Sequence, residues 1–213
     1  MIDILCVVDD NNPLQSFFIK EKDYLNNLLQ TQIANINFNV VYAKDITCED
    51  DFNNFRLKLD SSAIIAAYTH GNYDAFRINN INYIDKCNSE LMKDTMVYST
   101  SCNTAKGIGR QLKQDGCQAF VGYNDISFVS GFCEEYKEEM FMQCDHACIA
   151  SFLTNEGKHS TEAFQDAISY FDAKIKFAND MGDPILGGIL ARNKMALTLL
   201  YNKDITKADL CHA

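Results

Sequence analysis

Residues 63–71 read AIIAAYTHG, and residues 96–102 read MVYSTSC. Each stretch starts with an unbroken apolar run and ends in polar residues, with His70 near the end of the first and Cys102 at the end of the second. An apolar run without alternation is typical of a strand buried on both faces, as in a parallel sheet. Functional residues gather at the carboxyl ends of such strands. If the two strands are neighbours, His70 and Cys102 lie at the same sheet edge.

Strand and helix patterns alternate around these two stretches. Further strand patterns lie at residues 2–8, 36–43 and 118–123. Helical periodicity lies at residues 16–34, 49–60 and 104–115. The last helix is expected to stop at Gly116, because glycine is a natural C-terminal cap. The alternation predicts an α/β fold, a three-layer sandwich with a mainly parallel central sheet and helices on both faces.

Two smaller elements are predicted between the quoted stretches. Residues 73–84 have the pattern of a hairpin, with Asn79 and Asn80 at its turn. A short helix is expected at residues 87–93. The hairpin directly follows Gly71, so it forms either a wall of the site or a cover for a sheet edge.

The second part of the chain is predicted to be helical. Helices are expected at residues 131–154, 160–180 and 185–202, with helix starts at Ser160 and at the Asp183-Pro184 pair. The 213 residues then form one domain. Residues 1–125 supply the sheet core and residues 126–213 supply a mainly helical completion.

The composition excludes several classes of function. The formal net charge is −10, which disfavours binding to nucleic acid and to anionic membranes. The first ten residues lack the basic region of a signal peptide, and no apolar run reaches the about 20 residues of a membrane span. Nine cysteines at irregular spacing favour reduced thiols over a disulfide framework. A cytoplasmic protein is therefore expected.

The residue types at the two strand ends suit nucleophilic catalysis. Cysteine attacks carbonyl groups as a thiolate, and a nearby imidazole can take its proton and return it to a leaving amine. Gly71 lets the backbone come close to a substrate, so the N–H groups of Gly71 and Cys102 could form an oxyanion hole. The alternative is structural: Cys102 as a small buried residue and His70 as a hydrogen-bonded strand end.

A family resemblance favours catalysis. Residues 68–71 (YTHG) and residues 99–105 (STSCNTA), each after an apolar strand, resemble the CHAT branch of the caspase-like cysteine peptidases. That family has one strand ending in Thr-His-Gly and another ending in Ser-Ala-Cys-x-Thr-Ala. The resemblance extends over residues 62–180. Ser101 stands where the family has alanine, and the caspase signature Gln-Ala-Cys is absent.

The resemblance implies a cysteine endopeptidase with a caspase-like fold. His70 matches the general base, Cys102 the nucleophile, and Gly71 the glycine that donates to the oxyanion. Proteins or peptides are the implied substrates. No cofactor is needed, although calcium activates some relatives. Many members carry sensor domains that this chain lacks, so a separate regulatory protein is expected.

The residue that precedes the cut differs among these relatives. Asp9, Asp10 and Asp125 fall near the carboxyl ends of the central strands, where the substrate side chain would bind. An acid there would pair with arginine or lysine, so cleavage after a basic residue is predicted. The alternative is that all three are solvated loop acids, since aspartate is common in turns.

Other functions remain open at this point. Residues 144–148 read CDHAC, with Cys133 upstream, but the second ligand pair of a zinc site is missing, and no metal site is predicted. One alternative to the peptidase is a non-catalytic interaction module on the same fold. A second keeps the thiol chemistry but changes the acceptor, which gives an amidase or an acyltransferase.

Overall fold

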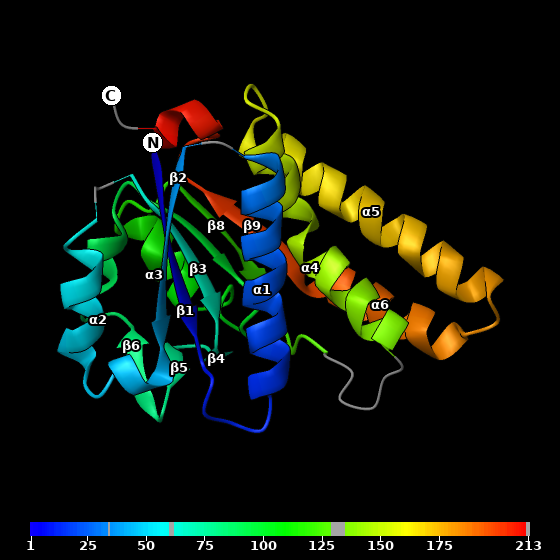
Figure 1. Ribbon diagram of the computed structural model, residues 1–213, viewed down its shortest axis with the longest axis horizontal. Helices are drawn as coiled ribbons and strands as arrows, with labels where there is room; N and C mark the ends of the chain where they lie inside the picture. Colours follow the sequence, from blue (N-terminus) through cyan, green and yellow to red (C-terminus); the bar gives the residue numbers. More distant parts are fainter. Residues whose placement is uncertain (34, 60–61, 129–134, 212–213) are drawn as a thin grey trace.

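The structure is a computed structural model that describes residues 1–33, 35–59, 62–128 and 135–211. Its centre is a six-stranded sheet with the strand order β2-β1-β3-β7-β8-β9 (Figure 1). The first five of these strands are parallel, and β9 runs antiparallel to β8. The strands are β1 Ile2–Val8, β2 Ile36–Tyr42, β3 Ile64–Tyr68, β7 Met96–Ser99, β8 Ala119–Tyr123 and β9 Leu197–Tyr201.

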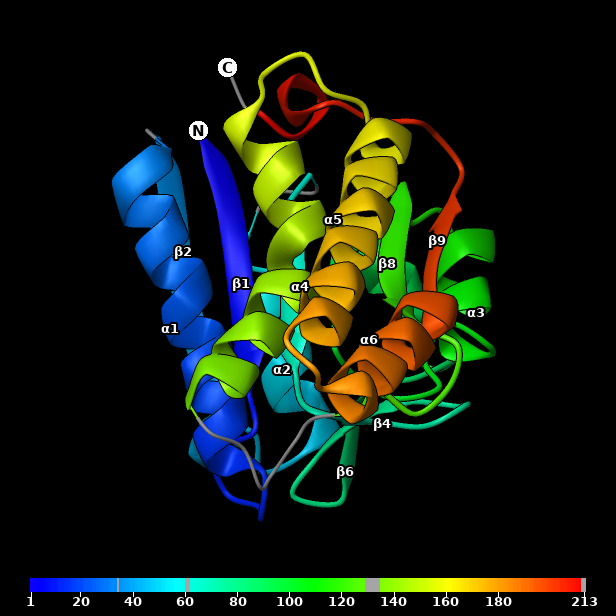
Figure 2. The same cartoon turned by 90° about the vertical axis from the view of Figure 1, so that its right-hand side faces the viewer.

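Helices cover both faces of this sheet (Figures 1 and 2). One face packs against α1 Gln15–Gln32, α4 Glu135–Thr154, α5 Ser160–Asp180 and α6 Pro184–Ala196. The other face packs against α2 Glu49–Arg56 and α3 Ile108–Gln114. Short 3₁₀ helices lie at η1 Ala43–Asp45, η2 Ser89–Met92 and η3 Lys207–Leu210. The predicted α/β arrangement with a mainly parallel sheet is confirmed.

Burial on both faces explains why the strands read as continuous apolar runs. In β1, Ile4 and Cys6 face the core under α1 and α4, whereas Leu5 and Val7 face the core under α2 and α3. All four residues are buried. Neither face of the strand can therefore accept the polar residues that alternate along a half-exposed strand.

A three-stranded antiparallel sheet lies beside the carboxyl edge of the main sheet. It consists of β4 His70–Gly71, β5 Phe76–Ile78 and β6 Ile81–Ile84. Asn79 and Asn80 join β5 to β6 with φ angles of 49° and 65°, the left-handed values that a two-residue hairpin turn requires. The predicted hairpin and its turn are confirmed, and His70 and Gly71 belong to the same small sheet.

The prediction of a helix over residues 185–202 was wrong at its C-terminal end. Asp183 caps α6 by accepting a hydrogen bond from the Leu186 N–H at 2.9 Å, but the helix ends at Ala196. Residues 197–201 form β9, which pairs with β8 in register. A short apolar run carries no periodicity that separates strand from helix, and here the open edge of β8 decides.

The predicted helix over residues 104–115 starts later than expected. Asn103 has a φ of 60°, and the Ala105 N–H donates to the Tyr123 carbonyl at 3.0 Å rather than along a helix. The Ile108 N–H donates to the Tyr73 carbonyl at 2.7 Å, and regular helix begins there. Tertiary hydrogen bonds thus take the amides of the predicted first turn. The predicted end is confirmed, because Gly116 has a φ of 98° just beyond the helix.

The remaining predicted elements differ only in their bounds. Helix α2 ends at Arg56 rather than at residue 60, and the short helix near residue 90 is the 3₁₀ turn η2. The predicted helix over residues 131–154 starts partly outside the described residues, and α4 begins at Glu135. Among the helices that the structure describes, none has the length and apolar character needed to cross a membrane.

Candidate active site at the carboxyl edge of the sheet

The two polar strand ends meet at one edge of the sheet. Strands β3 and β7 are parallel neighbours, with Ala67 opposite Ser99. Beyond this register, the Thr100 N–H donates to the Ala67 carbonyl at 3.3 Å, and the Ser101 hydroxyl donates to the Thr69 carbonyl at 2.7 Å. The segments that lead to His70 and Cys102 are therefore joined by hydrogen bonds within the three residues before each of them.

Gly71 packs directly against the backbone of the Cys102 loop. A Cβ atom added to Gly71 would lie 2.5 Å from Thr104 Cγ2, 2.7 Å from Ser101 Cβ and 2.9 Å from the Cys102 carbonyl oxygen. All three distances are shorter than contacts that real Cβ atoms make. The residue after His70 must therefore be glycine, because only a residue without a side chain allows this approach.

His70 and Cys102 line the same small cavity of about 30 Å³. This volume matches about one water molecule in the liquid. Leu14, Phe17 and Phe18 close the cavity on the side of α1. His70 and Cys102 both lie in the described part of the chain, and their side chains form no hydrogen bond with each other. Such bonds are often long before substrate binds, so the geometry is compatible with a resting dyad.

The Cys102 thiol is half-buried and rests in its neutral form. Its Sγ donates a weak hydrogen bond to the Ser127 carbonyl at 3.8 Å. Burial is the main cause that raises the thiol pKa above its ordinary value of 9.0, and the negative charge of Asp125 acts in the same direction. The thiol therefore needs a base to become a nucleophile at neutral pH.

His70 is solvent-exposed and is the base within reach of this cavity. Its ring stands edge-on to the ring of Phe18, with 5.6 Å between the centroids and 85° between the planes. This contact from α1 is apolar and leaves both ring nitrogens without a hydrogen-bond partner in the described part of the chain. The imidazole can therefore accept a proton without first breaking a bond.

The backbone at Cys102 suits an oxyanion hole. The neighbouring Asn103 has a φ of 60° and donates its N–H to the Asp125 carbonyl at 3.1 Å. In contrast, the Cys102 N–H has no acceptor on another residue among those the structure describes. An N–H group held by a rigid turn and left unpaired is the type of donor that stabilises a developing negative charge.

Helix α6 holds the loop that closes the site next to Cys102. The buried Asn193 side chain accepts a hydrogen bond from the Phe128 N–H at 2.9 Å and donates one to the Phe128 carbonyl at 2.8 Å. The guanidinium of Arg192 lies over the Phe128 ring, 4.3 Å from its centroid. These contacts fix Ser127, whose carbonyl meets the thiol. Asn193 lies 91 residues from Cys102, and no local pattern indicates it.

The three acids predicted to bind the substrate side chain lie in different surroundings. Asp9 is buried and lines a second cavity, of about 120 Å³, which also contains His70. Asp10 accepts a hydrogen bond from the Ala43 N–H at 3.0 Å, at the start of η1. Asp125 accepts from the Ile126 N–H at 2.8 Å and lies 4.0 Å from the Arg192 guanidinium. Of these three acids, Asp9 is the one that lines a described cavity with His70, and Cys102 does not line that cavity.

Two hydroxyl groups at the site have no hydrogen-bond partner among the residues that the structure describes. Thr100 Oγ1 and Ser127 Oγ are buried without a hydrogen bond, and both residues line the 30 Å³ cavity with Cys102. A buried unpaired hydroxyl is costly and is typical of a place where a ligand or water completes the bonding. Thr100 precedes Cys102 by two residues, so its position in the quoted stretch is a signal that the sequence prediction did not use.

A buried polar network lies under the sheet edge, between α1, α4 and the strands. His146 Nδ1 donates to the Met142 carbonyl at 2.8 Å, so Nε2 is the atom that accepts from the Tyr68 hydroxyl at 2.7 Å. Burial lowers the His146 pKa to about 4 and raises the Glu21 pKa well above 4.5. Glu21 Oε2 lies 3.4 Å from Nδ1, and burial disfavours the charged form of both groups.

The CDHAC segment of α4 belongs to this interior. Cys144 and Cys148 are buried in the core, and the Tyr123 hydroxyl donates to Asp145. Burial raises the Asp145 pKa to about 7. Within residues 1–33, 35–59, 62–128 and 135–211, no group of three or more His, Cys, Asp or Glu side chains is arranged to hold a metal ion. Cys133 lies outside these residues.

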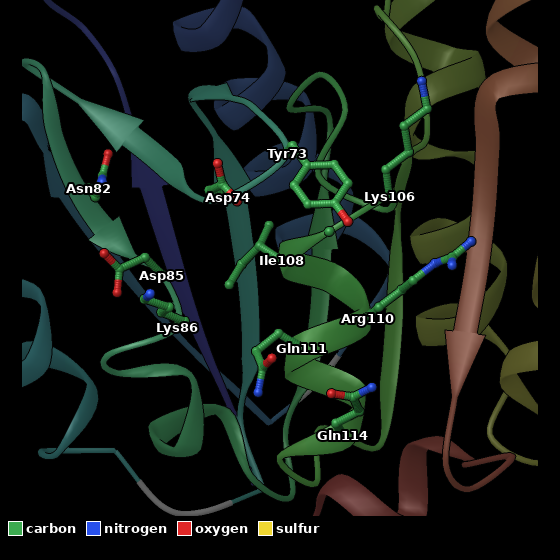
Figure 3. Close-up of a pocket in the computed structure, with 11 residues that line it drawn as sticks. Tyr73, Asp74, Asn82, Asp85, Lys86, Lys106, Ile108, Arg110, Gln111 and Gln114 are labelled. Carbon is green, nitrogen blue, oxygen red and sulfur yellow. The ribbon is translucent and has the colours of Figure 1, made fainter.

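A larger cavity, of about 600 Å³, lies between the hairpin and α3. Figure 3 shows Ile108 and Gln111 on the side of α3 that faces Asp85, whereas the guanidinium of Arg110 points away from them. The lining carries charges of both signs and no cysteine or histidine. The candidate catalytic side chains therefore line the smaller cavities around His70 and not this larger one.

No protein-family model matches the chain, and a comparison with curated proteins found no match either. The assignment of a function therefore rests on the geometry of the residues described above.

Proposed function

We propose that the protein is a cysteine endopeptidase of the caspase-like type, with Cys102 as nucleophile and His70 as general base. The observation that carries this proposal is the packing of Gly71 against the Cys102 loop, which brings a histidine and a cysteine to one cavity. A merely structural pair would not require a glycine with this close approach. The parallel order of β3 and β7 supports the same conclusion, since catalytic groups gather at such strand ends.

The catalytic steps follow from the positions of these groups. His70 takes the thiol proton, and the thiolate of Cys102 attacks the carbonyl carbon of the peptide bond. The negative charge that develops on the carbonyl oxygen is held by the N–H groups of Gly71 and Cys102. His70 then gives its proton to the leaving amine. Water, activated by His70, hydrolyses the thioester and regenerates the thiol.

The resting site must open before a peptide can bind. A cavity of about 30 Å³ does not admit an amino-acid side chain, and the neutral thiol is not yet activated. Movement of Phe17 and Phe18 at the start of α1 would widen it. A separate regulatory protein, as well as the substrate itself, could supply the binding energy for this movement.

The small cavity and the raised thiol pKa also favour a second candidate, a non-catalytic interaction module. In that case the cavity beside Cys102 would stay closed, and the protein would catalyse no reaction. An amidase or acyltransferase would use the same dyad but a different acceptor. The three candidates differ in whether peptides are cut and in whether Cys102 is needed.

Cleavage of a fluorogenic peptide library separates these candidates. We expect the wild type and Cys87→Ala to cleave peptides equally, since Cys87 is exposed and remote from the cavity. Cys102→Ala is expected to lose all turnover while keeping its circular dichroism spectrum. Cleavage by Cys102→Ala at the rate of the wild type would refute the assignment of the nucleophile. Absence of cleavage in every protein, with and without calcium, would favour the interaction module.

A further inference from the structure

The cavity of about 120 Å³ beside His70 combines two opposite charges that do not meet. Asp9 lies at the carboxyl end of β1, and Arg77 lies on β5, directly opposite His70 in the antiparallel register. Paired residues of an antiparallel ladder project to the same face, so His70 and Arg77 face the same space. In the described part of the chain, no salt bridge joins Asp9 to Arg77.

Arg77 is a half-buried cation without a partner. Its Nε is buried and makes no hydrogen bond. The other guanidinium nitrogens also make no hydrogen bond or ion pair within residues 1–33, 35–59, 62–128 and 135–211. A guanidinium in a protein is always charged and presents N–H donors in a fixed plane. Leaving the buried Nε unpaired beside a cavity is costly, unless a ligand supplies an acceptor.

Asp9 supplies the complementary acceptor. The residue is only 2% exposed, and its Oδ1 accepts a long hydrogen bond of 3.3 Å from the Asn11 N–H. Its second oxygen accepts no hydrogen bond in the described residues. The lining of the cavity therefore includes both guanidinium donors and a carboxylate acceptor.

Asn79, which also lines this cavity, already forms hydrogen bonds with its side chain. Asn79 donates to the Ala43 carbonyl at 2.8 Å and accepts from the Asn11 amide at 3.1 Å. Its side chain is therefore not available to a ligand. Both bonds tie the hairpin turn to the ends of β1 and β2, which fixes the distance between Arg77 and Asp9.

We propose that this cavity binds a carboxamide side chain, asparagine before glutamine, of a substrate residue that borders the scissile bond. This inference rests on the proposed peptidase function. The carboxamide oxygen accepts from the Arg77 guanidinium, and the carboxamide NH₂ donates to Asp9. Neither a carboxylate nor a cation fits both partners, because each meets a like charge on one side.

The volume supports the same ligand. A cavity of about 120 Å³ equals about four water molecules at about 30 Å³ each. This is room for the methylene and carboxamide of asparagine. Asp9 therefore takes part in substrate binding as the sequence predicts, while the preferred side chain is neutral rather than basic.

The test compares cleavage rates of peptides that differ only beside the cut. For the wild type, we expect kcat/KM for asparagine to exceed that for aspartate, arginine and lysine at least tenfold. Arg77→Gln is expected to shift the preference toward lysine, and Asp9→Asn toward aspartate, each by at least tenfold. Asp23→Asn and Arg110→Gln, which change exposed charges elsewhere, should keep the wild-type profile. Cleavage with a basic, acidic or absent preference overturns the carboxamide site and leaves the peptidase in place.

Direct binding keeps the inference testable if no peptide is cleaved. Acetyl-asparagine methylamide is titrated into Cys102→Ala while the His70 ring signals are followed by NMR. We expect shifts that saturate at millimolar ligand, that are at least tenfold weaker with the lysine and aspartate analogues, and that are lost in Asp9→Asn/Arg77→Gln. No shift, or equal shifts with all three analogues, overturns the site independently of turnover.

Discussion

At the residue scale, Gly71 connects His70, the proposed general base, to the loop of Cys102, the proposed nucleophile. Its Cα packs onto Ser101 and Thr104 and onto the carbonyl of Cys102. A side chain here would push the loop that carries the nucleophile, and displacement of about 1 Å can reduce a rate about 100-fold. The glycine thus matters for the position of two other residues, whatever its own amide does.

We expect Gly71→Ala to destabilise the fold by about 1–3 kcal/mol, the usual range for an overpacked core, and to lower peptidase activity about 100-fold. Gly188→Ala is the matched control, because no atom lies within 4 Å of its added Cβ on helix α6. Alanine in a helix should stabilise the control by about 0.5–1 kcal/mol. Chemical denaturation measures both changes. Equal stability of Gly71→Ala and the wild type would contradict the close packing.

The pH dependence of thiol labelling tests the resting state of Cys102. Because burial and the Asp125 charge raise its pKa above 9.0, the thiolate fraction is small at pH 7 and grows as the pH rises. Alkylation by iodoacetamide should therefore accelerate up to and beyond pH 9. At pH 7 it should be slower than at the exposed Cys48. Mass spectrometry of labelled peptides gives both rates. A plateau below pH 7 would mean that His70 already holds the thiol proton in the resting protein.

At the element scale, a buried polar network joins α1 and α4 to the sheet beneath the dyad. Glu21 comes from α1, Asp145 and His146 from α4, and Tyr68 and Tyr123 from β3 and β8. All five side chains are buried. Because burial penalises charge, it favours the protonated form of the two acids and the neutral form of His146. Folding of these elements is therefore linked to proton uptake.

Asp145→Asn is expected to remove part of this linkage. The folded chain keeps the Asp145 proton up to about pH 7, whereas the unfolded chain loses it near the ordinary pKa of 3.8. The folded state therefore binds more protons between these values, and the wild type loses stability as pH rises through this window. Asparagine cannot ionise. The free energy of unfolding of the variant, relative to that of the wild type, should therefore increase by on the order of 1 kcal/mol per pH unit between pH 5 and 7.

Urea denaturation at pH 5, 6, 7 and 8 measures this difference. The His146 pKa of about 4 makes stability rise with pH below about 6.5, but this contribution is common to both proteins and cancels. The difference between variant and wild type should grow up to pH 7 and then become constant. Parallel curves at every pH would show that Asp145 is ionised in the folded protein.

At the scale of the whole molecule, the sheet and the position of His70 and Cys102 at one edge of it could be predicted because both depend on local patterns. The apolar runs of β1, β3, β7 and β8 reflect burial on both faces, and His70 and Cys102 follow such runs directly. Strand β9 could not be predicted, since only the open edge of β8 makes residues 197–201 extended.

The parts of the site that the sequence missed come from distant segments. Neither Asn193 nor Arg77, the proposed ligand of a substrate side chain, shows a signal in the sequence, because their positions depend on the packing of α6 and the hairpin near His70 and Cys102. Asp9 was predicted at the correct sheet edge, but the cation opposite it was not. Charge complementarity within a cavity depends on side chains from several elements, which no single stretch of sequence contains.

The hydrogen bonds between Asn193 and Phe128 also have a consequence for the order in which the site is completed during translation. Translation delivers β1, β3 and β7, and with them His70 and Cys102, well before helix α6 and its Asn193. Until that helix emerges from the ribosome, the loop beside the thiol has no anchor and the outer edge of β8 has no partner strand. During most of its synthesis, the nascent chain therefore contains His70 and Cys102 without the anchor from α6 and without strand β9. In the proposed peptidase, this order would keep the site incomplete until synthesis of the chain is nearly finished.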